Sequence, residues 1–350
     1  MHADFVTLDS PRWNEVVARM PHDFFHRAEY VRLAAEHERG EPLGFVACDG
    51  DAVFLAPLIV KPIAASLVPE CERWFDAASP YGYAAPVVSP KNPPADFLKR
   101  AVSEFKACLQ RRKIVACFLR LHPLLELPLD DVDGAGEVVM RGRTVSIDLT
   151  QPEADIWAQI RKSHRRNLKR AAENGYVAAY DESWSEFEAF LEIYEGSMRR
   201  LGARSYYFFP RAFFEGLRNS LREHVHLFVV RKGSDVAAAS LYTECGGIVS
   251  AFLGGTAGRF VEDSPLKCLD YQVSTWAKAR NNRVFHMGGG LGGKEDSLFD
   301  FKAGFSPRRH PFRTWHIIAD QTTYGDLVAR RGRQNLPASD GFFPAYRAPL

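Results

Sequence analysis

Hydrophobic and polar residues alternate along this chain in two rhythms, one typical of strands and one typical of helices. Short apolar runs predict strands at residues 43–48, 53–60, 114–121 and 144–149. Between residues 94 and 111, apolar side chains recur every three or four positions, at Phe97, Ala101, Phe105 and Cys108. This spacing predicts an amphipathic helix whose apolar face covers a sheet.

The second half of the chain repeats this order of elements. The pattern predicts a long helical region at 155–174, a strand near Val177, a helix at 184–200, strands at 226–231, 236–244 and 248–254, a helix at 266–280 and a strand at 284–287. Each half therefore predicts an α/β fold with a mixed sheet and flanking helices. The repetition is one of architecture, because the residues themselves do not repeat.

The length of 350 residues exceeds one ordinary core, so two domains of roughly 150 residues are expected. Residues 127–142 are rich in Pro, Asp and Gly, which places the junction close to Thr144. We expect an N-terminal domain at 1–143, a C-terminal domain at 144–325 and a tail at 326–350 that has no periodicity.

Composition is that of an ordinary globular protein, with 46% hydrophobic and 25% charged residues. The 45 basic and 43 acidic side chains nearly cancel, so any attraction to polyanions must be local. The six cysteines form no Cys-x-x-Cys pair, which argues against a zinc site, and we expect no metal and no bound cofactor. No signal peptide and no long apolar stretch is evident, so we expect a soluble, cytoplasmic protein with no membrane insertion and no DNA partner.

A glycine-rich stretch follows the last predicted strand, with five glycines at positions 288–293. Glycine allows a backbone to approach a ligand closely, because no Cβ intrudes. Gly288, Gly293 and Lys294 match half of a P-loop, but Glu295 stands where a magnesium-binding Ser or Thr is needed, so we reject a nucleotide triphosphatase. A lysine, Lys302, follows; a solvated lysine after a strand-to-helix connection is an equally good interpretation.

A basic helix is predicted between residues 157 and 171, with six Arg and Lys side chains at positions 161–170. Trp157, Ile160, His164, Leu168 and Ala171 form its apolar side. The cationic side is either an ordinary solvated face or a cradle for the phosphates of tRNA, a nucleotide sugar or coenzyme A. In the second interpretation the phosphate-binding residues are Arg161, Arg165, Arg166 and Lys169.

The order of these motifs resembles that of the Fem-type transferases, which belong to the tandem proteins of the GNAT (N-acyltransferase) superfold. The motifs are the basic helix with Gly175-Tyr176 after it, Ser197-Met198-Arg199, Tyr206-Tyr207-Phe208-Phe209-Pro210, Ser264-Pro265, Trp276-Ala277, Gly288-Gly289-Gly290, and Phe301-Lys302 before Phe305. In the first half, Ser79-Pro80-Tyr81-Gly82-Tyr83 is similar to an aromatic-glycine turn of that group.

The resemblance implies two GNAT-like domains and transfer of an acyl group to an amine. Fem-type members move an amino acid from aminoacyl-tRNA to a peptidoglycan precursor, while other GNAT proteins use acyl-CoA. The resemblance implies that Lys302 faces the reacting ester and that Arg199, Tyr206 and Tyr207 line the acceptor site. It adds Tyr81, Tyr83, Gly289 and Gly290 to the substrate-binding residues.

The chemistry also explains a lysine at this place. When an amine attacks an ester or thioester, negative charge grows on the carbonyl oxygen, and a fixed cation there lowers the barrier by roughly 3–4 kcal/mol. The amine must also lose a proton. Asp300, Asp296 and His286 are candidates to accept it, and the sequence does not rank them; we place Asp300 with Lys302 as the catalytic pair.

The donor remains open between two kinds of molecule. CoA-dependent GNAT domains carry Arg/Gln-x-x-Gly-x-Gly/Ala before a helix, where backbone N–H groups hold the pyrophosphate. Residues 254–265 lack that spacing and contain two acids, which argues against CoA. The leading hypothesis is aminoacyl-tRNA-dependent transfer onto a small, possibly phosphorylated amine of an envelope precursor or specialised metabolite. Alternatives are an acyl-CoA-dependent N-acyltransferase and a non-catalytic tandem domain that binds RNA or a nucleotide.

Overall fold

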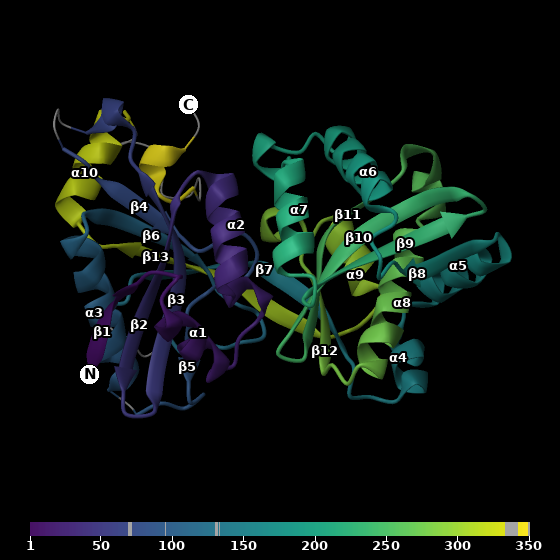
Figure 1. Ribbon diagram of the computed structural model, residues 1–350, viewed down its shortest axis with the longest axis horizontal. Helices are drawn as coiled ribbons and strands as arrows, with labels where there is room; N and C mark the ends of the chain where they lie inside the picture. The colour runs from purple at the N-terminus through teal and green to yellow at the C-terminus, as the bar shows by residue number, and fades with distance from the viewer. Residues whose placement is uncertain (69–71, 95, 130–131, 133, 333–341, 349–350) are drawn as a thin grey trace. The chain divides into compact units, whose positions relative to one another are not determined.

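The computed structural model describes residues 1–68, 72–94, 96–129, 132, 134–332 and 342–348. It divides into two compact units, residues 1–141 with 312–350 (unit 1) and residues 142–311 (unit 2). Figure 1 shows unit 1 in purple, blue and yellow and unit 2 in teal and green. Each unit contains a mixed sheet with helices packed on it, so the predicted α/β class is confirmed.

Unit 1 is built on strands in the order β1-β2-β3-β4-β6-β13, with β5 paired to β3. The strands are β1 (His2–Val6), β2 (Glu41–Asp49), β3 (Ala52–Pro62), β4 (Phe75–Ala78), β5 (Val87–Ser89), β6 (Ile114–Arg120) and β13 (Arg309–Ile318). The helices are α1 (Pro11–Ala18), α2 (Ala28–Glu38), α3 (Phe97–Arg111) and α10 (Gln321–Arg330), with short 3-10 turns η1 (Phe24–His26), η2 (Ala65–Leu67) and η7 (Ala345–Arg347). Neighbours are antiparallel except β4 and β6, which α3 connects.

Side chains alternate between two cores in unit 1, as the two-residue period of a strand requires. Phe45 packs with Phe105 of α3 on one face, and Val46 packs with Trp13 and Val31 on the other. The predicted helix face of α3 is confirmed, since Phe97, Ala101, Phe105 and Cys108 are all buried.

Unit 2 repeats the architecture with strands in the order β7-β12-β11-β10-β9-β8. The strands are β7 (Glu137–Asp148), β8 (Tyr176–Tyr180), β9 (Val225–Lys232), β10 (Asp235–Cys245), β11 (Ile248–Thr256) and β12 (Val284–Gly288). The helices are α4 (Glu153–Gln159), α5 (Lys162–Glu173), α6 (Phe187–Arg200), α7 (Arg211–Ser220), α8 (Leu266–Ala279) and α9 (Ser297–Ala303), with 3-10 turns η3 (Ser205–Tyr207), η4 (Gly258–Asp263) and η5 (Leu291–Gly293). Again one neighbouring pair is parallel, β11 and β12, and α8 connects it.

The two faces of the unit 2 sheet carry different helices. Leu269 and Val273 of α8 pack with Phe228 and Phe285 in one core. On the opposite face α6 lies very close to β11, because a Cβ on Gly255 would come 2.2 Å from the Ser197 hydroxyl. Glycine at this position therefore allows helix and strand to touch.

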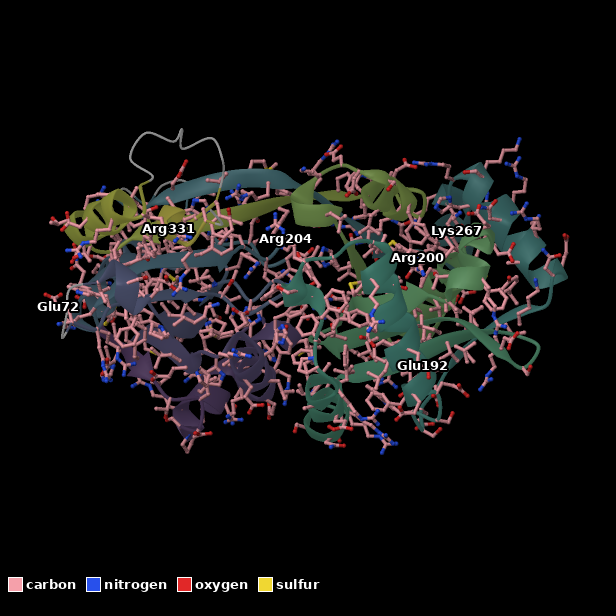
Figure 2. The ribbon with its side chains drawn as sticks, turned by 90° about the horizontal axis from the view of Figure 1, so that it is seen from above. Glu72, Glu192, Arg200, Arg204, Lys267 and Arg331 are labelled. Carbon is pink, nitrogen blue, oxygen red and sulfur yellow. The ribbon has the colours of Figure 1, made fainter. Side chains whose placement is uncertain are left out.

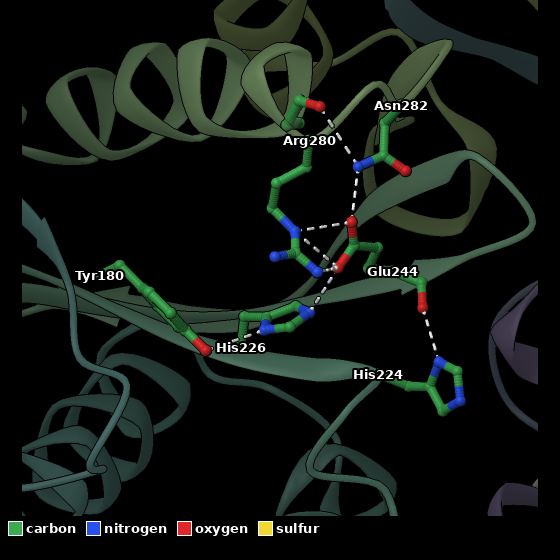
Figure 3. A network of polar contacts seen from close by, with 7 residues as sticks. Tyr180, His224, His226, Glu244, Arg280 and Asn282 are labelled. Atoms are coloured by element: carbon green, nitrogen blue, oxygen red, sulfur yellow. Dashed lines mark hydrogen bonds and ion pairs between the residues drawn. The ribbon is translucent and has the colours of Figure 1, made fainter.

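A network centred on Glu244 ties the C-terminal end of α8 to the sheet (Figure 3). Arg280 donates to both carboxylate oxygens of Glu244 at 2.8 and 3.0 Å, and the Asn282 amide donates at 2.6 Å. The Nε2 atom of His226 lies 3.0 Å from Glu244, and its Nδ1 atom lies 3.2 Å from the Tyr180 hydroxyl. Burial alone would raise the pKa of Glu244, but these hydrogen bonds outweigh it and lower the pKa to about 2.

Two boundaries differ from those expected. The predicted helix at 155–174 is two helices, because Ile160 and Arg161 take extended backbone angles between α4 and α5. Residues 312–325, expected in the C-terminal domain, belong to unit 1, because β13 pairs with β6. Of the expected tail, residues 342–348 pack on unit 1, where Arg347 binds the buried Asp76; residues 333–341 and 349–350 lie outside the described residues.

Candidate active site

The two parallel strands of unit 2 separate after three paired residues. Ile248, Val249 and Ser250 pair with β12, and β11 then continues to Thr256 beside β10 alone. A bulge lies between Ala251 and Leu253, where the register of β11 on β10 shifts by one residue. Among the described residues, the edge of β11 that follows Ser250 pairs with no further residue of β12; it lies at the carboxyl ends of the parallel strands, where α/β folds bind ligands.

The equivalent strands of unit 1 are closed. Pairing of β4 with β6 continues to Ala78 and Phe118, and the Ser79 N–H then donates to Phe118 O at 2.9 Å. The Arg120 N–H donates to the Ser79 hydroxyl at 3.0 Å. We therefore place the candidate site in unit 2.

The glycine loop after β12 folds around Asp296. Its carboxylate accepts from the Leu291 and Phe299 N–H groups, both at 3.0 Å. Burial opposes ionisation, but these backbone hydrogen bonds lower the pKa of Asp296. The protein's own carboxylate thus takes the backbone N–H groups that a P-loop would offer to phosphate. At Gly290 a Cβ would lie 2.0 Å from Lys294 O, so the turn requires glycine there.

Lys302 lies on α9 and is half-buried. Its Nζ atom donates to Gly289 O at 2.6 Å, which fixes the ammonium group against the glycine loop. Burial lowers the pKa of Lys302 to about 8, while the charges of Asp270 and Asp296 oppose the shift. The structure therefore brings Lys302 and Gly289 together, two of the residues predicted for the site.

Asp270 is a buried acid that the sequence analysis missed. It lies on α8, where its Oδ1 atom accepts from the Tyr242 hydroxyl at 2.9 Å. Burial raises the pKa of Asp270 to about 7, against the opposing effects of Tyr242 and the Lys302 charge. A signal was present, because Asp270 falls in the apolar stripe of the helix, next to Leu269 and three residues before Val273.

The basic helix grips the segment that carries Lys302. The Arg161 N–H donates to Gly304 O at 2.7 Å, and His164 Nε2 donates to Phe301 O at 2.9 Å. A Cβ on Gly304 would come 2.3 Å from the His164 ring, so glycine permits this approach. The first turn of α5 thus holds the last turn of α9.

Asp300, predicted as catalytic, and Arg161, predicted to bind phosphate, pair with each other. Two hydrogen bonds of 2.9 and 3.0 Å join them, and the Arg161 hydrogen bond lowers the pKa of Asp300. This contact makes both residues part of the joint between α5 and α9, a role that the prediction did not include. The remaining cations of α5 have no ion pair within the residues that the structure describes; they are Lys162, Arg165, Arg166, Lys169 and Arg170.

The other residues predicted to bind substrate lie on elements other than α9 and its glycine loop. Arg199 is exposed on α6 and pairs with Glu195 at 2.7 Å, on the face of the sheet opposite the core that contains α9. Tyr206 and Tyr207 contact each other edge to face in η3. Tyr81 and Tyr83 belong to unit 1 and contact its aromatic residues: Tyr81 O accepts from the Tyr30 hydroxyl, and the Tyr83 ring packs on Phe25 and Phe312.

The connection from β11 to α8 contains η4 in place of a glycine-rich phosphate loop. Asp263 in this turn accepts from the Tyr176 hydroxyl. Two basic residues flank the connection (Figure 2): Arg200, which donates to Thr256 O at 3.0 Å, and Lys267, the second residue of α8. The structure therefore has the short turn η4 at the place where a CoA-dependent GNAT domain has its glycine-rich pyrophosphate loop.

Residues 158–302 match the family model of the acetyltransferase (GNAT) domain, a span that ends at Lys302 itself. Unit 2 carries a GNAT acyltransferase domain. No curated protein sequence matches the chain significantly. The predicted GNAT fold is confirmed for this domain, and the predicted likeness to Fem-type proteins is confirmed as a likeness in fold to FemX over most of the chain.

Three solved structures have a fold similar to that of this chain at low sequence identity. FemX superimposes with a TM-score of 0.69 and 13% identity, covering 93% of this chain and 99% of that chain. The C-terminal domain of a protein assigned as lysylphosphatidylglycerol synthetase in Agrobacterium fabrum superimposes with a TM-score of 0.53 and 16% identity, covering 91% of this chain and 93% of that chain. L-PGS from Bacillus licheniformis superimposes with a TM-score of 0.52 and 13% identity, covering 93% of this chain and 97% of that chain.

The described residues contain no helix that is both long enough and apolar enough to cross a bilayer. In the same part of the chain, no group of three or more His, Cys, Asp and Glu side chains is placed to hold a metal ion.

Proposed function

We propose that this protein transfers an aminoacyl group from aminoacyl-tRNA to the amine of a small acceptor, with Lys302 stabilising the oxyanion. The observation that carries the proposal is the ammonium group of Lys302, fixed on Gly289 O beside the open end of β11 and β12. An ammonium group has three donors, and Gly289 occupies one of them. Within the described part of the chain its other donors have no hydrogen-bond partner, and they would bind an ester oxygen that becomes negative as the amine attacks.

The basic helix supports a donor with several phosphates. Five cations of α5 lack an ion pair among the described residues, and α5 contacts α9 directly. A nucleic acid that binds these cations would place its reactive end on the element that carries Lys302. The protein would then act in the cytoplasm, where aminoacyl-tRNA is made, on an envelope precursor or specialised metabolite whose amine is the acceptor.

Acyl transfer from acyl-CoA is the second candidate, because the matching family model is that of acetyltransferases. The closed η4 turn, with Asp263 near the start of α8, weighs against a pyrophosphate at that place. A non-catalytic RNA-binding protein is less well supported, because a half-buried lysine held against a glycine loop has no role in it.

The test is transfer of labelled amino acids from a charged tRNA pool into the small-molecule fraction of a cell extract. Parallel reactions contain ribonuclease-treated tRNA or labelled acyl-CoA. We expect transfer that ribonuclease abolishes. Transfer from acyl-CoA alone would replace the proposal with the second candidate, and absence of transfer from both donors across extracts would contradict both enzyme functions.

A further inference from the structure

Asp270 is buried and Lys302 is half-buried, and these groups of opposite charge form no ion pair with each other. Neither has an ion pair within 4.0 Å among the described residues, although each shifts the titration of the other. Buried charges are usually paired directly, because removal from water is costly. A separation that the fold maintains therefore calls for an explanation.

Each group is held by a different neutral partner. The Tyr242 hydroxyl on β10 fixes the Asp270 carboxylate at 2.9 Å, and Gly289 O fixes the Lys302 ammonium at 2.6 Å. The four residues come from α8, β10, α9 and the loop after β12, which meet at one buried core that contains Tyr242, Leu269 and Phe299 and against which Phe301 packs. Because Asp270 does not bind Lys302, the ammonium group keeps its donors while it still feels a negative charge.

We propose that Asp270 is a positioning residue for the transfer step: held by Tyr242, its carboxylate keeps the half-buried Lys302 ammonium charged without taking its hydrogen bonds. This inference rests on the proposed role of Lys302. An alternative direct ion pair would satisfy the ammonium group and leave less of its charge for the reacting oxygen.

The other charged and titratable groups around Asp270 and Lys302 already have partners of their own. On α9, Asp296 also attracts Lys302, but its oxygens accept from Leu291 and Phe299 N–H groups. From α5, His164 contacts the Phe301 carbonyl, and Arg161 is paired with Asp300. From β10, Tyr242 faces Asp270. Asp270 is thus the carboxylate near Lys302 that is neither a helix cap nor an ion-pair partner.

Burial and the charge of Asp270 shift the pKa of Lys302 in opposite directions. Burial favours neutral Lys302, and the negative charge of Asp270 favours the ammonium form, so removal of that charge must lower the pKa of Lys302 below about 8. The pKa of Asp270 is about 7, so its carboxylate is available over the range in which Lys302 titrates.

The experiment is an NMR titration of the Lys302 amino group in protein labelled with ¹³C and ¹⁵N lysine, assigned with Lys302→Met. For Asp270→Asn, which keeps an oxygen for Tyr242, we expect the pKa of Lys302 to fall by roughly one pH unit. Tyr242→Phe should lower it by less, because Asp270 stays in place but ionises less readily. The control Glu295→Gln removes an exposed charge of the same loop and should leave it unchanged.

An unchanged pKa of Lys302 in folded Asp270→Asn, or an equal fall in Glu295→Gln, would overturn the inference. Should Asp270→Asn fail to fold, Tyr242→Phe decides by the same criterion. The measurement needs no substrate, so its outcome is independent of whether the proposed transfer is found. Once a substrate is known, the alkaline limb of the pH–rate profile should move to lower pH in Asp270→Asn, which a purely structural role would not produce.

Discussion

Arg161 and Asp300 lie 139 residues apart in the chain and join two helices through two hydrogen bonds of 2.9 and 3.0 Å. Arg161 precedes the basic helix α5, and Asp300 lies on α9, two residues before Lys302. Together with the Arg161 N–H bond to Gly304 O, this contact makes the cationic helix and the lysine segment one structural body. A ligand bound on α5 would therefore lie on a helix that is hydrogen-bonded to the element that carries Lys302.

Gly304→Ala should damage this joint. The new Cβ would lie 2.3 Å from His164 Nε2, so the helices must move apart, at a cost of about 1–3 kcal/mol in the free energy of unfolding. We also expect a loss of transfer activity, because Lys302 moves with α9. Gly325→Ala in α10 is the control: its Cβ would meet nothing within 4 Å, so stability should stay or rise. Equal stability of the two variants in urea unfolding would contradict this account.

Lys302→Met should remove the oxyanion donor while its chain still fills the site. We expect kcat to fall about 10²–10³-fold in the transfer assay, with circular dichroism unchanged. Lys294→Met removes an exposed lysine of the same loop and should retain nearly full activity. A folded Lys302→Met enzyme with normal kcat would exclude the proposed role.

The cations of α5 should determine how binding of tRNA depends on salt. In Arg165→Gln/Arg166→Gln/Lys169→Gln, the slope of log K against log salt should be smaller by about 2 to 3, since each phosphate contact contributes about 0.7–0.9. Arg222→Gln, an exposed arginine outside α5, should leave the slope unchanged. Filter binding between low and physiological salt measures both. An unaltered slope in the triple variant would mean that α5 is only a solvated face.

Glu244→Gln should destabilise unit 2. The change weakens an acceptor shared by Arg280, Asn282 and His226 and leaves a cation without its partner. Since Glu244 is partly exposed, we expect a loss of about 2 kcal/mol, below the value for fully buried pairs. Glu223→Gln removes an exposed carboxylate nearby and should change stability little. Denaturant unfolding of the two variants separates the network from a general effect of charge.

Periodicity predicted α3, α6, α8 and most of the long strands, because their core faces follow simple spacings. It gave no prediction for the shorter or less regular elements, which are β1, β4, β5, β13, α1, α2, α7 and α10. It failed at Ile160 and Arg161, where two extended residues interrupt an apolar stripe that runs on into α5. It also could not separate residues 312–325 from the C-terminal domain, since β13 joins unit 1 by pairing with the distant β6.

The candidate site was only partly predictable. Lys302 and the glycine loop stand out in the sequence, and the structure joins them through Gly289 O. The pairing of Asp300 with Arg161 depends on a contact between distant segments, which no local pattern reports. Asp270 carried a signal, an acid within an apolar helix stripe, but its partner Tyr242 lies on a strand that precedes it by 28 residues.

His26 should make the protein lose stability in mild acid. It is fully buried in unit 1, where Nε2 donates to Ala85 O at 2.8 Å, and burial lowers its pKa to about 4. In the unfolded chain the His26 ring takes up a proton near pH 6.5, whereas in the folded protein it does so only near pH 4. The free energy of unfolding is therefore greatest above pH 6.5 and falls by about 3 kcal/mol as the pH drops to about 4. Urea unfolding at several pH values measures the slope, which His26→Gln should flatten and the exposed His2→Gln should not. A slope that His26→Gln leaves unchanged would assign the acid sensitivity to another group, such as His316, whose pKa burial also lowers to about 4.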